Sequence, residues 1–227
     1  MQGTKYQLFI TDDDSHSIRL GNSNITYHST RGAIQEARHV FITAGLEACL
    51  NKNEEPESVS VLEVGFGTGL NALLTGLKAE ETQKQVHYIS IDPFPLPKDI
   101  FSQLNYGSLL QSERLYHNIM DAGWETVHAI SPNFSLKKVK AGLADIVFHE
   151  KFDVIYFDAF APEDQPEMWE VPIFEKLWEA LNPAGFLTTY CSKSQVRRNL
   201  KTVGFLVEKL PGPPGKREII RAYKKLS

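Results

Sequence analysis

The stretch that decides the fold is V-S-V-L-E-V-G-F-G-T-G-L-N, residues 59–71. It begins with a short apolar run typical of a buried strand and continues through Gly65, Gly67 and Gly69 into a helix start. Glycine has no Cβ, so it permits a tight turn and lets a ligand lie almost against the backbone. The first turn of a helix also leaves backbone N–H groups free to bind a ligand. The stretch therefore predicts a nucleotide-like cofactor between a strand and a helix.

The spacing of the glycines separates two classes of cofactor. The dinucleotide fingerprint G-x-G-x-x-G needs glycine at position 70, where this chain has Leu70. The pattern present is E-x-G-x-G-x-G, beginning at Glu63, and it resembles that of S-adenosylmethionine (SAM) dependent methyltransferases of the Rossmann-like class. We therefore expect SAM as the cofactor, bound by this turn together with Glu63 and Asn71.

Length and composition are those of an ordinary globular protein. The chain has 227 residues, 42% of them hydrophobic and 23% charged, which is enough for one well-buried domain. No apolar run approaches the roughly 20 residues of a membrane span, and residues 1–14 lack the pattern of a signal peptide. Cys49 and Cys191 have neither metal-binding nor redox spacing, which favours buried thiols in a reducing cytoplasm. The net charge of −4 does not indicate a nucleic-acid binder, so that role needs a local basic patch.

The order of the elements indicates an α/β fold. Between residues 59 and 204, apolar runs of strand length alternate with stretches of helical periodicity. Such alternation predicts a doubly wound, mostly parallel sheet, which binds its ligand outside the carboxyl ends of its strands. The strand-like runs at residues 205–210 and 218–223 flank a loop rich in proline and glycine, so they predict an antiparallel hairpin at the sheet edge.

The first fifty residues carry a different pattern. Residues 6–10 and 17–20 resemble two short strands and predict a small hairpin. Residues 32–50 have apolar side chains at a spacing near 3.6, which is typical of an amphipathic helix. We therefore expect an N-terminal extension, residues 1–50, packed on a SAM-dependent methyltransferase domain, residues 51–227.

Three carboxylates are candidates for binding the cofactor. Asp92 ends the next strand-like run, at a distance along the chain typical of an acid that binds ribose hydroxyls, with a turn residue as the alternative. Asp145 is a candidate for binding the adenine amino group, with a solvated loop acid as the alternative. Glu63 lies in an apolar strand, where a buried carboxylate needs a partner. The α-ammonium of SAM, directly or through a water, would provide that partner.

Asp158 is the candidate catalytic residue. It directly follows the strongest strand-like run of the chain, residues 152–157, so we expect it to face the cleft beside the sulfonium of SAM. Methyl transfer is an in-line displacement, for which the enzyme positions a lone pair and removes a proton. An amine arrives mostly as ammonium, and a carboxylate that orients it and accepts its proton meets that need. The alternative role is a helix N-cap or a turn residue.

Three motifs resemble those of the methyltransferase domain of the MnmC family. They are E-V-G-F-G-T-G-L-N at residues 63–71, D-A-F-A-P with P-E-M-W within residues 158–169, and G-K-R-E at residues 215–218. The D-x-F-A-P-x-x-x-P-E-M-W run is far more specific than the glycine turn. The MnmC family makes 5-methylaminomethyl-2-thiouridine at the wobble position of certain tRNAs.

The resemblance implies a function for the chain. SAM would be the methyl donor, and the acceptor would be the primary amine of 5-aminomethyl-2-thiouridine in the anticodon stem-loop of a tRNA. By position, the three glycines and Asp92 would bind SAM, and Asp145 would bind its adenine. Asp158 would be the catalytic residue beside the amine. Tyr27 begins a segment that differs from the bifunctional members, and it would cover the cofactor as a lid.

Bifunctional members of the family carry a flavin oxidase domain after the methyltransferase. This chain ends at Ser227 and has no second glycine fingerprint for FAD. It therefore resembles the stand-alone form of the family, which does not itself make the aminomethyl group from its carboxymethylated precursor.

Two sets of side chains are candidates for contact with tRNA. Clustered cations bind phosphates even when the total charge is negative, and aromatic or apolar side chains near the catalytic residue stack on a flipped-out base. The alternatives are a solvated helix face, an ordinary charged loop and packing in the core. The candidates are Lys193, Arg197, Lys216 and Arg217 for phosphates, and Phe160, Met168 and Trp169 for the base.

Two other classes of function are open at this point. One is a SAM-dependent N-methyltransferase, or an enzyme similar to an aminopropyltransferase, that acts on a free small amine; the acidic net charge favours it slightly. The other is a SAM-binding module without catalysis, against which Asp158 and the intact glycine turn argue. Transfer of a methyl group to tRNA would separate these possibilities.

Overall fold

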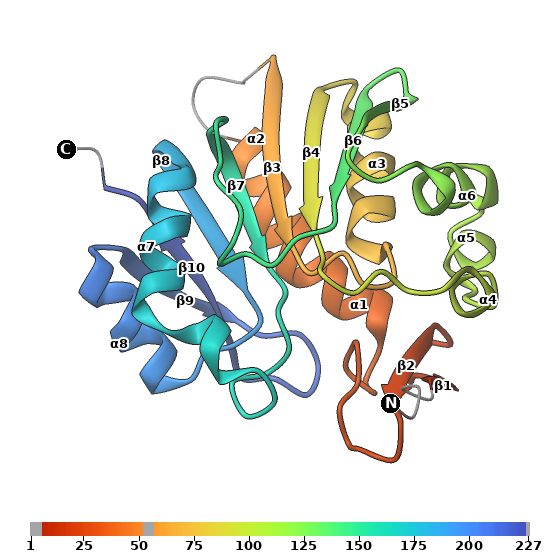
Figure 1. The fold of residues 1–227 in the computed structure, drawn as a ribbon, viewed down its shortest axis with the longest axis horizontal. Helices are drawn as coiled ribbons and strands as arrows, with labels where there is room; N and C mark the ends of the chain where they lie inside the picture. The colour runs from red at the N-terminus through yellow and green to blue at the C-terminus, as the bar shows by residue number, and fades with distance from the viewer. Residues whose placement is uncertain (1–5, 52–56, 226–227) are drawn as a thin grey trace.

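A central sheet of eight strands forms the middle layer of the structure, a computed structural model that describes residues 6–51 and 57–225 (Figure 1). The strand order is β5-β6-β4-β3-β7-β8-β10-β9, and the five strands from β6 to β8 run parallel. This topology confirms the predicted doubly wound α/β fold. The strands span Val127–Ser131 (β5), Phe134–Val139 (β6), Gln85–Ile91 (β4), Ser58–Val64 (β3), Phe152–Phe157 (β7), Leu181–Thr189 (β8), Glu218–Tyr223 (β10) and Leu206–Pro211 (β9).

Antiparallel strands form both edges of the sheet. At one edge β10 lies between β8 and β9, so the predicted C-terminal hairpin is present and its second strand lies inside the sheet. At the other edge β5 pairs with β6. The sequence of β5, V-H-A-I-S, is partly exposed and lacks an apolar run, so periodicity did not predict this strand.

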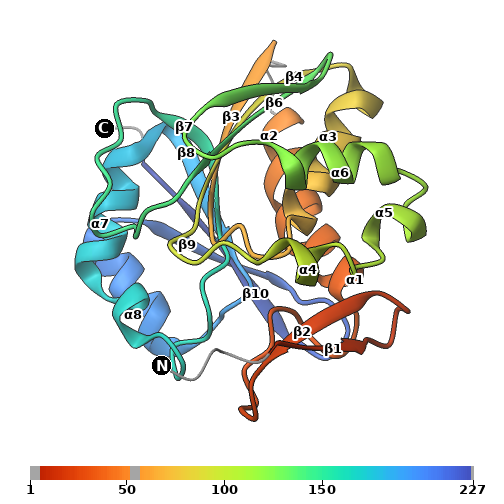
Figure 2. The same ribbon diagram turned by 45° about the vertical axis from the view of Figure 1, so that its right-hand side comes forward.

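Helices cover both faces of the sheet (Figure 1 and Figure 2). The side chains of β3 and β4 on one face share a hydrophobic core with the first helices of the chain, and those of β7 and β8 on the other face pack against the last two helices. The first face carries α1 (Ala33–Ala37), η1 (Arg38–Glu47), α2 (Ala48–Leu50), α3 (Leu70–Thr82) and α6 (Glu113–Asp121), and the second carries α7 (Val171–Ala180) and α8 (Ser194–Val203). Three short helices lie in connections: α4 (Lys98–Phe101), α5 (Tyr106–Leu109) and η2 (Pro166–Trp169).

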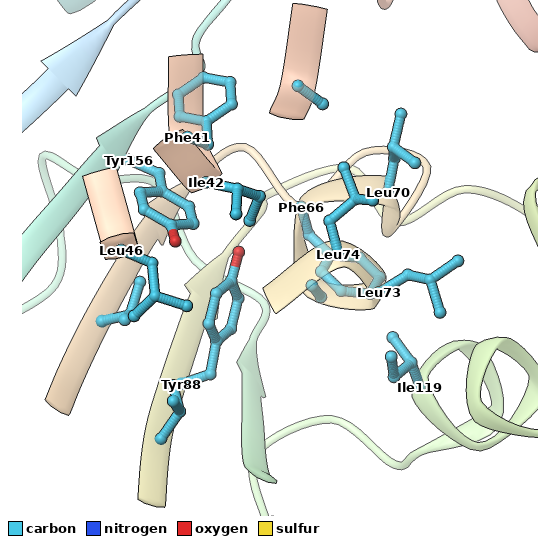
Figure 3. Close-up of a cluster of buried hydrophobic side chains, with 14 of the residues drawn as sticks. Phe41, Ile42, Leu46, Phe66, Leu70, Leu73, Leu74, Tyr88, Ile119 and Tyr156 are labelled. Carbon is cyan, nitrogen blue, oxygen red and sulfur yellow. The ribbon is translucent and has the colours of Figure 1, made fainter. Parts of the chain in front are cut away.

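The helix predicted over residues 32–50 is present, and its middle part, η1, is wound as a π-helix. Gly45 of η1 lies against Tyr156 of β7, where a Cβ would come within 2.9 Å of the tyrosine ring. Phe41 packs on the same ring, with centroids 5.2 Å apart (Figure 3). The buried side chains of this helix are part of the hydrophobic core of the sheet. The predicted division of the chain at residue 50 into an extension and a methyltransferase domain stays a prediction.

The predicted N-terminal hairpin consists of β1 (Tyr6–Ile10) and β2 (His16–Leu20). It lies outside the central sheet, beside α1 (Figure 1). The chain then turns back, and the amide of Tyr27 donates to the carbonyl of Ile18 at 2.9 Å. This return carries Tyr27 and His28 to the glycine turn, where both side chains make contacts.

Cys49 and Cys191 are both buried. In the ranges 6–51 and 57–225, none of the helices combines the length and the apolar character needed to cross a lipid bilayer.

Candidate functional site

Backbone hydrogen bonds bring the carboxyl ends of four strands to one edge of the sheet. The amide of Gly65 donates to Ile91 at 2.9 Å, the amide of Asp92 to Val139 at 3.0 Å, and the amide of Asp158 to Val64 at 3.0 Å. Each of these bonds fixes the residue that follows one strand to the neighbouring strand. The glycine turn, Asp92 and Asp158 therefore lie together, as expected for the ligand-binding edge of a doubly wound sheet.

The glycine turn needs each of its three glycines. Gly65, Gly67 and Gly69 have φ angles of 94°, 48° and 73°, in the left-handed region that side chains with a Cβ rarely adopt. A Cβ on Gly65 would lie 2.7 Å from the carbonyl oxygen of Asp158, and one on Gly69 would collide with the sulfur of Met120. The three glycines are therefore required by the packing of the turn itself, in addition to the close approach that they allow a ligand.

Asp92 stabilises the same turn. One carboxylate oxygen accepts a hydrogen bond from the Gly67 amide at 2.9 Å, and the other accepts from the Phe94 amide at 2.8 Å. Burial raises the pKa of Asp92, while these two backbone bonds oppose the rise. Each carboxylate oxygen keeps a second lone pair for a hydroxyl donor. Phe94 follows with 77% of its surface exposed, an exposed aromatic beside the turn that sequence patterns did not single out.

These features fit the parts of SAM. The turn offers a backbone surface on which a Cβ is excluded, and Asp92 offers acceptors for ribose hydroxyls at its side. Asp145, the predicted adenine ligand, lies after β6 in a turn closed by its amide to the Gly142 carbonyl at 3.1 Å, with an exposed side chain. Its role stays a prediction, and so does the alternative of a solvated loop acid.

Asp158 lies on the other side of the turn. Its Oδ2 accepts a hydrogen bond from Asn71 Nδ2 of α3 at 2.9 Å. Burial raises the pKa of Asp158 to about 7, and the charge of Glu36 adds to the rise, while Asn71 and the cation of Lys216 oppose it. A carboxylate with a pKa near neutrality is suited to accept a proton at physiological pH.

Lys216 faces this carboxylate from the loop between β9 and β10. Its ammonium forms an ion pair with Glu36 of α1 and lies 4.0 Å from the centre of the Tyr190 ring. Tyr190 in turn donates its hydroxyl proton to the carbonyl of Ala159 at 2.8 Å. Glu36 also accepts from the Ser29 amide at 2.9 Å. A cation and a second carboxylate are thus fixed beside Asp158.

Tyr27 and His28 cover the glycine turn. The Tyr27 ring lies so close to Gly67 that a Cβ there would be 3.1 Å from it, and it meets the Phe160 ring edge to face at 5.3 Å. His28 shares a hydrogen bond with the Thr68 hydroxyl at 2.8 Å, and burial lowers its pKa to about 4. The position of Tyr27 is compatible with the predicted lid, which stays a prediction.

The residues after Asp158 separate into two groups. Phe160 and Met168 are partly exposed, which keeps a contact with a base possible for both. Trp169 is 3% exposed, packs edge to face on Phe157 at 4.9 Å, and donates its indole proton to the Phe160 carbonyl at 2.8 Å. This burial favours the core alternative for Trp169 over stacking on a base. An edge of the ring lines a hollow of about 480 Å³ next to Lys193.

The predicted phosphate ligands gather beside the acceptor side of the site. Lys193 precedes α8 and forms an exposed ion pair with Glu163, while Arg197 bonds the Ser194 hydroxyl at 2.9 Å. The charges of Arg197 and Arg217 both lower the pKa of Glu218, after a larger effect from Lys209, which places α8 near the loop that carries Lys216. The binding of phosphates by the four cations stays a prediction.

Glu63 and Asn71 lie beneath the site instead of at its surface. Glu63 is 0% exposed and Asn71 is 3% exposed. Glu63 therefore lies below the surface that SAM would contact, and its predicted contact with the α-ammonium, directly or through a water, stays a prediction. Asn71 bonds Asp158, and its predicted role as a SAM ligand also stays a prediction.

Sequence patterns did not single out His28, Glu36 and Tyr190. The segment Y-H-S-T-R-G-A-I-Q-E, residues 27–36, contains two of them, but it has no motif of its own. Tyr190 ends an apolar strand and looks like core. No local signal in the sequence pairs Glu36 with Lys216.

Comparison with known proteins places this site in a family. A family profile described as S-adenosyl-L-methionine-dependent methyltransferase matches residues 115–225. The tRNA 5-methylaminomethyl-2-thiouridine biosynthesis bifunctional protein MnmC of Campylobacter hominis is 31% identical over 204 residues, which make up 87% of this chain and 30% of that protein. The protein of the same name from Chromobacterium violaceum is 29% identical over 228 residues, covering 96% and 34%. The chain spans about a third of the length of these curated relatives.

Solved structures share the fold. MNMC2 from Aquifex aeolicus aligns with a TM-score of 0.74 at 24% identity, and spermidine synthase from Thermotoga maritima with 0.61 at 16% identity. Each alignment covers 100% of this chain and 72% of the other. The architecture is that of class I SAM-dependent methyltransferases. From its motifs, its topology and these comparisons, the chain is an S-adenosyl-L-methionine-dependent methyltransferase with SAM as its cofactor, and it is similar over most of its length to part of the MnmC proteins.

Proposed function

We propose that the protein transfers the methyl group of SAM to the primary amine of 5-aminomethyl-(2-thio)uridine at the wobble position of tRNA, giving 5-methylaminomethyl-2-thiouridine. The observation that carries the proposal is Asp158, a partly exposed carboxylate with a pKa near 7 beside the glycine turn. It opens the D-x-F-A-P-x-x-x-P-E-M-W run, which resembles the MnmC family. The names of the relatives support the substrate.

The chain's own residues provide binding and proton transfer. Bound SAM supplies a methyl group that an amine lone pair displaces in line from sulfur. Asp158 orients the acceptor ammonium and takes one proton from it, directly or through a water, so that the nitrogen gains a lone pair. The cation of Lys216 disfavours a second positive charge nearby, which lowers the pKa of the acceptor amine.

The cofactor is held by the turn in this proposal. Gly65, Gly67 and Gly69 let SAM approach the backbone, Asp92 accepts from its ribose, and Asp145 accepts from its adenine amino group. The exposed Phe94 ring provides an apolar wall next to Asp92. Tyr27 closes the site above Gly67.

The tRNA binds through its anticodon stem-loop. Lys193, Arg197, Lys216 and Arg217 contact its phosphates, and Phe160 with Met168 flanks the flipped-out wobble base. A cytoplasmic location follows from a tRNA substrate.

Labelled methyl transfer tests the proposal. Purified protein is incubated with SAM carrying a tritiated methyl group and with bulk tRNA from cells that lack the wobble methylation. We expect label in tRNA, at a rate that Asp158→Asn lowers about 100-fold or more, while SAM binding measured by calorimetry persists. Label in free polyamines and none in tRNA would instead favour an enzyme acting on small amines, for which the acidic pair Asp158 and Glu36 would bind the substrate.

A further inference from the structure

A chain of buried polar side chains leads from Asp158 into the protein. Asn71 donates to Asp158, and deeper below it Glu63 accepts from the Ser90 hydroxyl at 2.6 Å. Asn71 and Tyr88 lie close enough to the Glu63 carboxyl for hydrogen bonding to affect its pKa. Glu63 and Ser90 are 0% exposed. Asn71 therefore lies between the catalytic carboxylate and a second acid that solvent does not reach.

Three atoms of this chain are buried and have no hydrogen-bond partner: Glu63 Oε1, Asn71 Oδ1 and the Tyr88 hydroxyl. Figure 3 shows the hydroxyls of Tyr88 and Tyr156 pointing toward the same space between the sheet and the helices. A buried polar atom without a partner destabilises the fold. Glu63 Oε1 and Asn71 Oδ1 are both acceptors when Glu63 is ionised, so a donor between them would give both a partner.

A proton on Glu63 Oε1 would provide the missing hydrogen-bond donor. Oε2 then accepts from Ser90, and Oε1–H becomes a donor in a place where Asn71 Oδ1 and the Tyr88 oxygen both lack one. An ionised Glu63 has no donor to offer and adds a second negative charge next to Asp158. Two nearby carboxyls in a buried place do not both ionise readily.

We propose that Glu63 is a positioning residue that stays neutral and, through Asn71, fixes Asp158 as the ionised carboxylate of the pair. This inference rests on the proposed role of Asp158 in methyl transfer. It assigns the two acids of the site opposite protonation states, with Asn71 between them.

The surroundings of the two acids support this division. Ser90 and Tyr88 of β4, Tyr156 of β7, Asn71 of α3 and Asp158 itself face Glu63, and none of these is a cation. Burial raises the pKa of Glu63 to about 8, and the charge of Asp158 adds to the rise, while hydrogen bonding to Ser90, Asn71 and Tyr88 only partly opposes it. Asp158 is faced by Asn71, Glu36, Tyr190, Glu63 and the cation of Lys216. The acid near a cation and near solvent is the one that ionises first.

Carboxyl titration by ¹³C NMR tests the inference on the protein without tRNA. Because a neutral Glu63 carries the same charge as glutamine, Glu63→Gln leaves the titration midpoint of Asp158 where it is in the wild type. Glu36→Gln is the matched control, since removing the Glu36 charge lowers that midpoint. A midpoint lowered by Glu63→Gln as much as by Glu36→Gln would mean that Glu63 is ionised, and would overturn the proposal.

A second pair of variants separates positioning from cofactor binding. Glu63→Met removes the hydrogen bonds to the chain, so we expect kcat to fall at least tenfold while the Kd for SAM stays within twofold, and Glu63→Gln to restore most of the loss. A Kd for SAM raised tenfold or more by Glu63→Gln would instead make Glu63 a cofactor ligand and contradict the proposal. Neither the titration nor SAM binding needs tRNA, so both results stand if the proposed tRNA substrate is wrong.

Discussion

The ammonium of Lys216 lies 4.0 Å from the centre of the Tyr190 ring, where Tyr190 directly follows β8 and Lys216 lies in the loop between β9 and β10. Glu36 fixes Lys216 from a third segment of the chain. A cation over an aromatic face is stabilised by about 0.5–2 kcal/mol. The loop that joins β9 to β10 is therefore attached to the acceptor side of the site.

Lys216→Met should slow methyl transfer at least tenfold at neutral pH. Without the cation, the pKa of Asp158 rises and less of its carboxylate is ionised. The Kd for SAM, measured by calorimetry, should change little. Lys209→Met, which breaks an ion pair with Glu218 on the same hairpin, is the control. Equal losses in both variants would mean that the hairpin matters only for folding.

The pH dependence of the reaction should reflect Asp158. Its pKa is raised to about 7, so kcat should fall as pH drops through 7 and the carboxylate becomes protonated. Single-turnover rates between pH 5.5 and 8.5 measure this limb. A rate that is flat over that range would remove Asp158 as the proton acceptor.

Asp158→Asn should stabilise the fold above neutral pH. A carboxyl whose pKa is raised by folding binds its proton more tightly when folded, so it destabilises the protein progressively as pH rises from about 4 to 7. The asparagine avoids this penalty, and we expect the Tm at pH 8 to rise by about 2–4 °C. At pH 4 the two proteins should melt at similar temperatures. A lower Tm for the variant at pH 8 would contradict the assigned pKa shift.

Gly65→Ala should abolish SAM binding. A Cβ there lies 2.7 Å from the Asp158 carbonyl oxygen and φ is 94°, so both the turn and the residue after β7 have to move. Gly21 also has a positive φ, of 55°, and nothing lies within 4 Å of an added Cβ, so Gly21→Ala is the control for a positive φ without a steric clash. Calorimetry with SAM compares the two.

Trp169 and Phe160 should respond differently to truncation. Trp169→Ala removes a core side chain and should cost about 3–5 kcal/mol of unfolding free energy. Phe160→Ala should leave stability within about 1 kcal/mol and raise the KM for tRNA. Urea denaturation and methyl-transfer kinetics measure the two effects, and a loss of stability in Phe160→Ala as large as in Trp169→Ala would contradict the separation.

The cofactor side of the site was predictable because its signals are local. The strand, the three glycines and the helix start are consecutive, and Asp92 ends the next strand, so topology alone brings it to the turn. Asp158 was predictable for the same reason. Hydrophobic periodicity likewise gave most strands and helices, except for the partly exposed β5.

The acceptor side was not predictable in the same way. Glu36 and Lys216 are 180 positions apart, and nothing in either local sequence names the other. Burial is the other property that local sequence did not give: Glu63 and Trp169 belong to motifs, and their side chains lie under the site. A motif indicates which residues lie near the active site, whereas packing decides which of their side chains are exposed to a ligand.

The most direct measurement is nucleoside mass spectrometry of tRNA before and after incubation with the protein and SAM. The substrate is tRNA that carries 5-aminomethyl-2-thiouridine at the wobble position. We expect this nucleoside to disappear and 5-methylaminomethyl-2-thiouridine to appear in equal amount, in a reaction that Asp158→Asn does not support. An unchanged wobble nucleoside, with SAM bound and the protein folded, would contradict the proposed function.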